Sequence, residues 1–252
     1  MTRSDAGRPA RETPSLEELR AFAACNLDVS LAAKAHELLT GPGPVSPGAE
    51  SGRWQDHIIL SEVPPGASVL DLGCGEGDLL STLIGRLDVR GQGVELNPLA
   101  VLKSIDRGVP VLNIDLDQGL VDFADQSFDY VILESTLQTL KAPLPTLTEM
   151  LRVGRRGIVS FPNFGHWRVR FDLAVRGRMP VTRGLPYGWH DTPNIHLFTL
   201  ADFLDWCGAN EVAVNNSFGL VEGRIQTPLS PSDNLIVEEA LLCLERAGKA
   251  GL

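Results

Sequence analysis

Short apolar runs alternate with helical patterns along the chain from Trp54 onward. The runs predict strands, and the recurrence of apolar residues every three to four positions predicts helices. Strands are expected over residues 68–72, 91–96, 109–115, 127–134 and 157–161, and helices over residues 77–87, 98–108 and 145–154. Pro98 at a helix start and Gly108 at its end are typical boundary residues.

This alternation indicates right-handed βαβ crossovers. We therefore predict an α/β fold with a mostly parallel, doubly wound sheet and helices on both faces. Two further strand-like runs, 211–218 and 234–246, end the pattern. We expect this late pair to form an antiparallel C-terminal edge.

Residues 1–52 follow another pattern. The first 14 residues are polar, and residues 15–40 read as a helix with a capping box formed by Ser15 and Glu18. Residues 41–52, GPGPVSPGAESG, are too rich in glycine and proline for a packed element. We predict a helical extension and Gly/Pro-rich linker over 1–52 and one domain over 53–252.

Composition narrows the possible partners. The chain has 252 residues, 43% of them hydrophobic, and a net charge of −10. This charge disfavours nucleic acid and anionic membranes. The N-terminus lacks the apolar core of a secretory signal, and no apolar run reaches the length of a membrane helix. The four cysteines form no CxxC pair, so we expect reduced thiols and a cytoplasmic location.

The turn after the first predicted strand indicates a ligand. It reads DLGCGEG from Asp71, and its glycines Gly73, Gly75 and Gly77 allow the backbone to approach a bound molecule closely. A pyrophosphate site prefers G-x-G-x-x-G, but this chain has Asp78 at the last position. Carboxylates favour an amine or sulfonium instead. The alternative interpretation is a glycine turn that only connects strand and helix.

Two more acids end the next strands. Glu95 follows Asp71 by 24 residues, where a carboxylate can accept hydrogen bonds from both ribose hydroxyls. Asp115 ends the third strand and can accept a hydrogen bond from an exocyclic amine such as that of adenine. An exposed acid at a strand end is the alternative for Glu95. Together the acids favour a cationic nucleoside ligand.

These features resemble the Rossmann-like class I methyltransferases, which bind S-adenosylmethionine (SAM). The resemblance covers roughly residues 54–245. It implies that the three glycines approach the methionine moiety of SAM or S-adenosylhomocysteine. It also implies that Asp71 lies near the ligand's amino group, Glu95 at the ribose and Asp115 at the adenine.

Longer strings are similar to the methionine-biosynthesis protein MetW family. They include DLDQGLVDFADQSFDYVILESTLQ, EMLRVGRRGIVSFPNFGHWRVR and GRMPVTRGLPYGWHDTPNIHLFT. Two positions depart from the family pattern: Glu134 begins a string in which a polar Gln is usual, and His190 replaces an aromatic phenol. The resemblance implies association with a homoserine O-acyltransferase of the MetX type and support of its activity. The alternative is an active SAM-dependent methyltransferase acting on a small molecule.

Two side chains are candidate proton acceptors, since methyl transfer needs alignment and at times proton removal. Glu134 ends the fourth strand, and His166 follows the fifth. The alternatives are a cofactor-pocket or cap contact for Glu134, and for His166 a structural imidazole packed with Trp167. No His spacing supports a metal site.

Residues 161–198 are rich in aromatic residues and arginines, although the chain is acidic overall. Such residues are enriched where proteins meet, so we expect a partner surface here rather than RNA binding. A solvated segment that covers the sheet edge is the alternative. The expected contact residues are Trp167, Arg168, Arg170, Arg178 and Tyr187.

Overall fold

The computed structural model of the protein describes residues 53–246, which form an eight-stranded sheet in the order β3-β2-β1-β4-β5-β8-β6-β7. The strands are β1 (Ser68–Leu72), β2 (Arg90–Glu95), β3 (Val111–Asn113), β4 (Phe128–Glu134), β5 (Gly154–Pro162), β6 (Val212–Val221), β7 (Arg224–Gln226) and β8 (Glu239–Arg246). The predicted extension and linker, residues 1–52, lie outside the described residues.

The first five strands are parallel, as predicted. β8 runs antiparallel to both β5 and β6, and β7 pairs antiparallel with β6. The antiparallel C-terminal part of the sheet is thus confirmed, with β8 inserted between β5 and β6. The strand order reverses between β1 and β4, which places a ligand crevice at the carboxyl ends of these strands.

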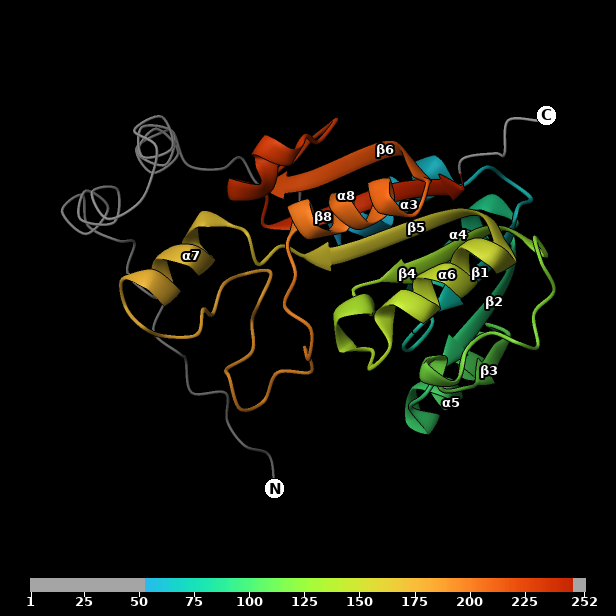
Figure 1. The fold of residues 1–252 in the computed structure, drawn as a ribbon. Helices are drawn as coiled ribbons and strands as arrows, with labels where there is room; N and C mark the ends of the chain where they lie inside the picture. The colour runs from blue at the N-terminus through green and yellow to red at the C-terminus, as the bar shows by residue number, and fades with distance from the viewer. Residues whose placement is uncertain (1–52, 247–252) are drawn as a thin grey trace, which may run out of the picture.

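Helices cover both faces of the sheet (Figure 1). They are α3 (Trp54–Glu62), α4 (Asp78–Leu87), α5 (Pro98–Asp106), α6 (Pro143–Val153), α7 (Trp167–Ala174) and α8 (Leu200–Ala209). Short 3-10 turns are η1 (Leu116–Gln118), η2 (Leu137–Thr139) and η3 (Pro231–Leu235).

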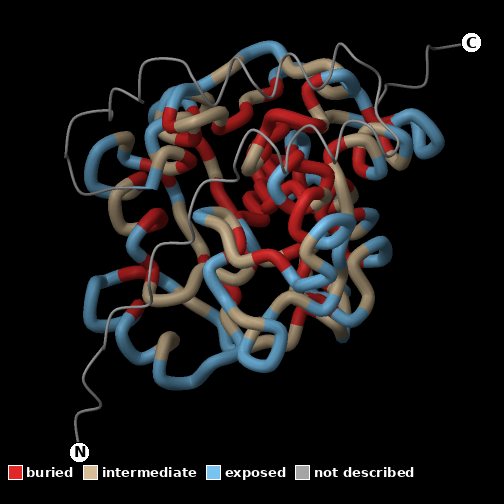
Figure 2. Tube along the Cα trace, turned by 90° about the vertical axis from the view of Figure 1, so that its left-hand side faces the viewer, coloured by how far each residue is buried: buried red, intermediate tan, exposed pale blue. Residues whose placement is uncertain are grey.

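The sheet separates two hydrophobic clusters. On one face α3 and α4 pack through side chains such as Ile59 and Leu80, and on the other α6 and α8 pack through Met150 and Phe203. Figure 2 shows that the buried parts of the chain gather at the centre, with exposed segments around them. The apolar runs of the sequence therefore form a single sheet buried on both faces, as parallel strands require.

Several elements differ from the sequence prediction. The helices α3 and α8 were not predicted, although Thr199 and Asp202 form a capping box at the start of α8. α3 spreads its apolar residues around the helix, so no periodic face marks it. β3 is shorter than predicted, and in the run 234–246 the strand begins only at Glu239 because η3 occupies its first residues.

The segment from α7 to α8 extends beyond the carboxyl ends of β4 and β5 (Figure 1, left). α7 is anchored by Trp167 and Phe171, which pack on Leu235 and Ile236. Residues 175–199, all of them described, contain no helix or strand. We call residues 167–198 the excursion.

Candidate functional site

The loop between β1 and α4 has the backbone that the glycine spacing predicts. Gly73, Gly75 and Gly77 have φ angles of +78°, +57° and +79°, and Gly77 is the N-cap of α4. A Cβ at Gly73 would meet the Thr136 hydroxyl at 2.5 Å, whereas one at Gly75 would meet no atom within 4 Å. The loop therefore packs closely at Gly73 against Thr136, just beyond β4, and opens into free space at Gly75.

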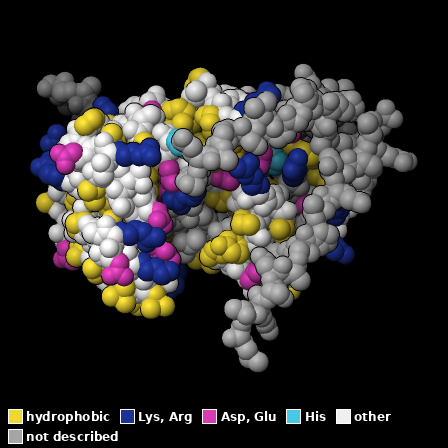
Figure 3. Space-filling model, turned by 180° about the vertical axis from the view of Figure 1, so that it is seen from behind, with side chains coloured by type: hydrophobic (Ala, Val, Ile, Leu, Met, Phe, Trp, Pro, Cys, Tyr) yellow, Lys and Arg dark blue, Asp and Glu magenta, His cyan; other side chains and the backbone are white. Residues whose placement is uncertain are grey.

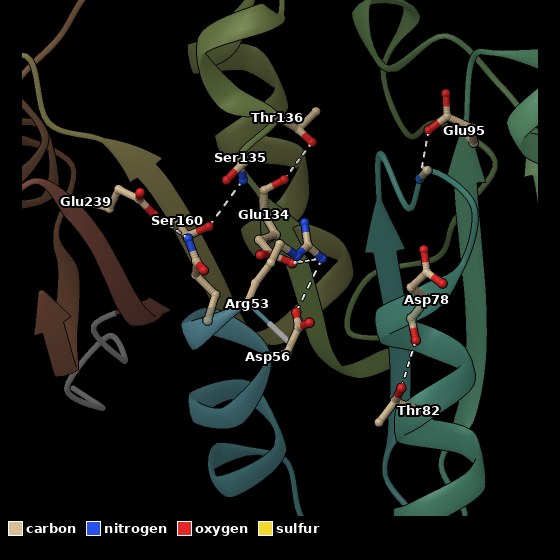
Figure 4. A network of polar contacts seen from close by, with 12 residues as sticks. Arg53, Asp56, Asp78, Thr82, Glu95, Glu134, Ser135, Thr136, Ser160 and Glu239 are labelled. Carbon is tan, nitrogen blue, oxygen red and sulfur yellow. Dashed lines mark hydrogen bonds and ion pairs between the residues drawn. The ribbon is translucent and has the colours of Figure 1, made fainter. Parts of the chain in front are cut away.

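Glu95 ends β2 and holds this loop in place (Figure 4). One carboxylate oxygen accepts from the Gly75 N–H at 2.9 Å, and the other accepts from the Asn97 N–H at 2.7 Å. Each oxygen keeps a further lone pair for other donors. The sequence thus correctly brings Glu95 and the glycine loop together.

Asp115 lies just beyond β3 and is partly buried. It caps η1 by accepting from the Asp117 N–H at 3.0 Å. The side-chain amide of Asn113, the last residue of β3, donates to the carbonyl oxygens of Glu95 and Leu96 at 2.8 and 2.9 Å. This side chain ties the ends of β2 and β3 together, so Glu95 and Asp115 lie at the same edge of the sheet.

Asp71 is buried in β1, with only 3% of its surface exposed. Burial raises its pKa from 3.8 to about 7, and the positive charge of Arg53 opposes this rise. Glu95 and Asp56 add negative charge nearby and act in the same direction as burial. A cation placed beside Asp71 would compensate for the solvation that this carboxylate loses in the folded protein.

Glu134 ends β4 and is also buried. Its Oε2 accepts from the Arg53 guanidinium at 2.9 Å, while its Oε1 has no hydrogen-bond partner in the described chain. Arg53 also contacts Asp56 at 3.3 Å (Figure 4). Burial raises the pKa of Glu134 to about 8, with Arg53 opposing. With this pKa the carboxyl is mostly protonated at pH 7 and ionises as the pH rises through about 8.

His166 is buried and is the N-cap of α7, where its Nδ1 accepts from the Arg168 N–H at 3.3 Å. Burial lowers its pKa to about 3, and the charges of Arg168 and Arg170 act in the same direction. Its ring lies 5.7 Å from that of Trp167. These contacts match the structural interpretation of His166, and its low basicity makes it a poor proton acceptor.

A cavity of roughly 490 Å³ opens next to Glu134 at the carboxyl ends of β4 and β5. The start of α3, the η2 turn, the start of β8 and residues 183–194 of the excursion form its walls. The Gln138 backbone carbonyl accepts from the Ile195 and His196 N–H groups at 2.9 and 3.0 Å, which fixes the end of the excursion over the sheet edge.

The excursion carries an exposed apolar and basic surface, but not through Trp167. That side chain is 3% exposed and belongs to a core cluster, so it supports the surface from inside and cannot itself face a partner. Arg170 is half-buried and donates to the Gly165 carbonyl at 2.6 Å. Arg168, Arg178 and Tyr187 are exposed, as contact with a partner would require.

The exposed apolar residues of the excursion were only partly foreseen. The side chain of Trp189 is 78% exposed. The exposed large hydrophobic residues of the excursion are Leu173, Val175, Met179, Tyr187, Trp189, Ile195 and Leu197. A second exposed group, Leu99, Leu102 and Ile105, lies on α5, at the lower left in Figure 3.

Sequence reasoning missed Arg53 and Gln138. Arg53 precedes an unpredicted helix, and nothing local indicates its pairing with a residue 81 positions away. Gln138 follows β4 in the string ESTLQ, whose resemblance to family strings was the available signal. Across residues 53–246, no three His, Cys, Asp or Glu side chains are grouped so as to hold a metal ion. In the same range no helix is both long and apolar enough to cross a membrane.

The fold and the loop after β1 define a protein with the class I methyltransferase fold. A possible histamine N-methyltransferase from Thermotoga maritima, described as SAM-dependent, superposes with a TM-score of 0.56 at 14% identity, over 76% of this chain and 87% of that one. A ubiquinone biosynthesis O-methyltransferase from Xanthomonas campestris is 31% identical over 143 residues, which are 54% of this chain and 59% of that protein.

The chain belongs to the MetW family, described as methionine biosynthesis protein MetW, whose model matches residues 53–244. A bifunctional methionine biosynthesis protein MetXA/MetW from Rhodopirellula baltica is 37% identical over 206 residues. These residues are 77% of this chain but 33% of that protein, so the chain spans about a third of this relative's length.

Proposed function

We propose that this protein binds SAM or S-adenosylhomocysteine and supports a MetX-type homoserine O-acyltransferase by associating with it. The observation that carries the proposal is the relative whose printed name joins MetXA and MetW in one chain. Functions joined in one polypeptide in one organism are natural candidates for a complex of separate chains in another.

The residues around the β1 loop fit such a nucleoside. Asp71 is a buried carboxylate whose raised pKa reports a missing compensating charge, which the ligand's ammonium would supply. Glu95 is held by two backbone N–H groups and would direct its remaining lone pairs to the ribose hydroxyls. The open space at Gly75 admits the ligand, and Asp115 would accept from the adenine amine.

Calorimetric titration with S-adenosylhomocysteine tests this part of the proposal. We expect saturable binding to the full chain, loss of binding in Asp71→Asn, and no binding of NAD. Uptake of NAD without uptake of the homocysteine compound would contradict the proposal, because carboxylates at the loop disfavour a pyrophosphate.

The proposed docking surface is the excursion. Arg168 and Arg178 are exposed cations in the same segment as exposed apolar residues such as Met179 and Trp189. Arginine and tryptophan are enriched at the energetic centre of protein interfaces. An acidic, partly apolar patch on the acyltransferase would complement this surface.

Co-purification with the homoserine O-acyltransferase of the same cell tests the association, and acyltransferase turnover with and without this protein tests the support. We expect Arg168→Glu with Arg178→Glu to abolish both. Arg86→Glu with Arg224→Glu, also exposed, is the charge-matched control, and Leu102→Glu examines the apolar group on α5. Unchanged association of the first double variant would exclude the excursion as the docking surface.

The second proposed function is methyl transfer to a small molecule, favoured by the similarity to a ubiquinone biosynthesis O-methyltransferase. Bound SAM supplies an activated methyl group on its sulfonium. In its ionised form, which becomes the major form only above about pH 8, Glu134 would accept a proton from a methyl acceptor held in the neighbouring cavity. Incubation of the protein with methyl-labelled SAM and cell extract distinguishes the two functions: labelled product supports transfer, and its absence supports the accessory role.

A further inference from the structure

The cavity at the ends of β4 and β5 has the features of a small-molecule site. Its volume, roughly 490 Å³, is within the range of about 300–1,000 Å³ found for ligand pockets. It lies apart from the β1 loop, since neither the glycines nor Glu95 and Asp115 line it. We propose that it binds a small zwitterionic α-amino acid, an inference that does not depend on SAM binding or on the acyltransferase.

A buried acceptor in the cavity wall lacks a donor. Gln138 is 5% exposed, and its Nε2 donates to the Ser135 carbonyl at 2.7 Å. This bond fixes which end of the amide is nitrogen, because a carbonyl can only accept. The Oε1 atom is buried without any hydrogen-bond partner in the described chain. A buried acceptor without a donor is unfavourable, so a ligand N–H group that reaches this oxygen would be favoured there.

A carboxylate in the cavity wall also favours a cationic group of the ligand. Glu239 lines the cavity, where its Oε2 accepts from Trp54 Nε1 at 3.0 Å and from Gln55 Nε2 at 2.6 Å. These neutral donors leave its charge uncompensated. Glu134, paired with Arg53 through Oε2, has a second unpartnered oxygen at the adjoining end of β4. An ammonium group satisfies an amide oxygen and a carboxylate at once.

Two arginines also line the cavity. Arg183 is exposed in the excursion and makes no ion pair within the described residues. Arg53 also lines the cavity and keeps donors beyond those used for Glu134 and Asp56. A guanidinium binds a carboxylate through two parallel hydrogen bonds. The cavity thus presents acceptors for an ammonium and forked donors for a carboxylate.

The rest of the lining combines polar residues, such as Ser135, Thr139 and Asn194, with apolar ones. Trp54, Tyr187 and three prolines, Pro162, Pro186 and Pro193, surround the polar groups. Rigid prolines and aromatic rings suit a short aliphatic side chain, because they offer apolar contact at little cost in side-chain entropy. A single amino acid therefore matches the site better than a peptide or a nucleotide.

Ligand-detected NMR and calorimetry on the full chain test the inference, with the twenty protein L-amino acids and L-homoserine at millimolar concentration as probes. We expect saturable binding of at least one probe. Its analogues without the amino group or without the carboxylate should each bind at least about tenfold more weakly. Equal binding of the analogue without the amino group would overturn the inference in favour of a simple anion site.

Variants separate this site from the nucleoside site. Arg183→Gln and Gln138→Leu should each weaken amino-acid binding about tenfold or more. Both variants should still bind S-adenosylhomocysteine normally. Arg183→Gln should also keep the melting temperature of the natural protein. Arg224→Gln, exposed on β7, is the matched control and should bind normally. The inference is wrong if no probe binds, or if Arg183→Gln binds like the control. Failure of the nucleoside to bind would leave these results unaffected.

Discussion

Arg53 donates through Nη2 to Oε2 of Glu134 at 2.9 Å and so connects the residue before α3 to the end of β4. The two residues differ in environment, since the guanidinium is half exposed and the carboxyl is buried. Burial raises the pKa of Glu134 to about 8, and Arg53 limits this rise. The contact with Arg53 therefore helps to set the pH at which the Glu134 carboxyl, between the β1 loop and the cavity, becomes ionised.

Arg53→Ala should destabilise the protein more at alkaline than at neutral pH. Without the guanidinium the pKa of Glu134 rises further, so the folded state keeps this carboxyl protonated at a pH where the unfolded state ionises it. Each pH unit above the pKa of about 8 corresponds to about 1.4 kcal/mol. We expect the loss in free energy of unfolding to be about 1 kcal/mol larger at pH 9 than at pH 6, measured by urea unfolding.

Arg86→Ala is the control, because Arg86 is exposed on α4 and should change stability by no more than about 0.5 kcal/mol at either pH. A loss for Arg53→Ala that is equal at pH 6 and pH 9 would show that the guanidinium does not set the protonation of Glu134.

Asp71→Asn should stabilise the ligand-free protein while it removes nucleoside binding. A carboxyl whose pKa is raised on folding stabilises the folded state below about pH 4, and this contribution is lost as the pH rises through about 7. The rise from 3.8 to about 7 sets an upper limit of about 4 kcal/mol. Urea unfolding from pH 5 to pH 8 should show a smaller fall in stability for the variant than for the natural protein.

Asp129→Asn should have the opposite effect on stability to Asp71→Asn, because folding lowers the pKa of Asp129 and raises that of Asp71. Ser68 donates to this carboxylate through its N–H at 2.9 Å and its hydroxyl at 2.7 Å, and these bonds lower the pKa of Asp129. Its stabilisation is present at neutral pH and is lost as the pH falls below the ordinary range of the carboxyl. The variant should therefore be less stable than the natural protein at pH 7. Parallel pH profiles for the two variants would contradict both assignments.

The parallel half of the sheet could be predicted because its signals are local. β1, β3, β4 and β5 each contain an apolar run near turn residues, and the spacing from Asp71 to Glu95 equals one βα unit. Parallel strands bring their carboxyl ends to one edge, so the sequence alone placed Asp71, Glu95 and Asp115 together there. α8 also carried a local signal in its capping box at Thr199.

The cavity and its charges could not be predicted because they arise from long-range contacts. Arg53, Gln138, Arg183 and Glu239 come from four segments, and only the insertion of β8 beside β5 brings Glu239 to the site. Composition likewise predicted that Trp167 would face a partner, but the side chain is buried. An aromatic residue beside arginines has the same local sequence whether it is exposed or packed. Burial depends on η3, which has no apolar periodicity.

Gly75→Ala should block the nucleoside site at a modest cost in stability. Gly75 has φ of +57°, where a Cβ costs roughly 1–2 kcal/mol, but a Cβ there meets no protein atom within 4 Å. Gly66→Ala is a close match, with φ of +75° and no neighbour within 4 Å, and it lies outside the loop. We expect similar melting temperatures for the two variants and loss of S-adenosylhomocysteine binding only in Gly75→Ala. Normal binding by Gly75→Ala would place the ligand elsewhere.

His166→Asn should reduce the fall in the free energy of unfolding that occurs as the pH drops below about 7. Burial lowers the pKa of His166 to about 3, below its ordinary value of 6.5, so its contribution is present above pH 6.5 and is lost as the pH falls toward 3. Between pH 7 and pH 5.5 this loss amounts to about 1 kcal/mol. Asparagine does not titrate and can still cap α7, so the variant should lack this part of the loss in urea unfolding.

His190→Asn is the matched control for this profile, because it makes the same substitution at an exposed histidine. The NMR signal of His166 should also stay constant between pH 5 and pH 8, because the imidazole remains neutral throughout. A midpoint near 6.5 would mean that the ring reaches water and can exchange protons, and His166 would then return as a proton acceptor beside Glu134. A constant signal leaves Glu134 as the titrating side chain at the end of β4.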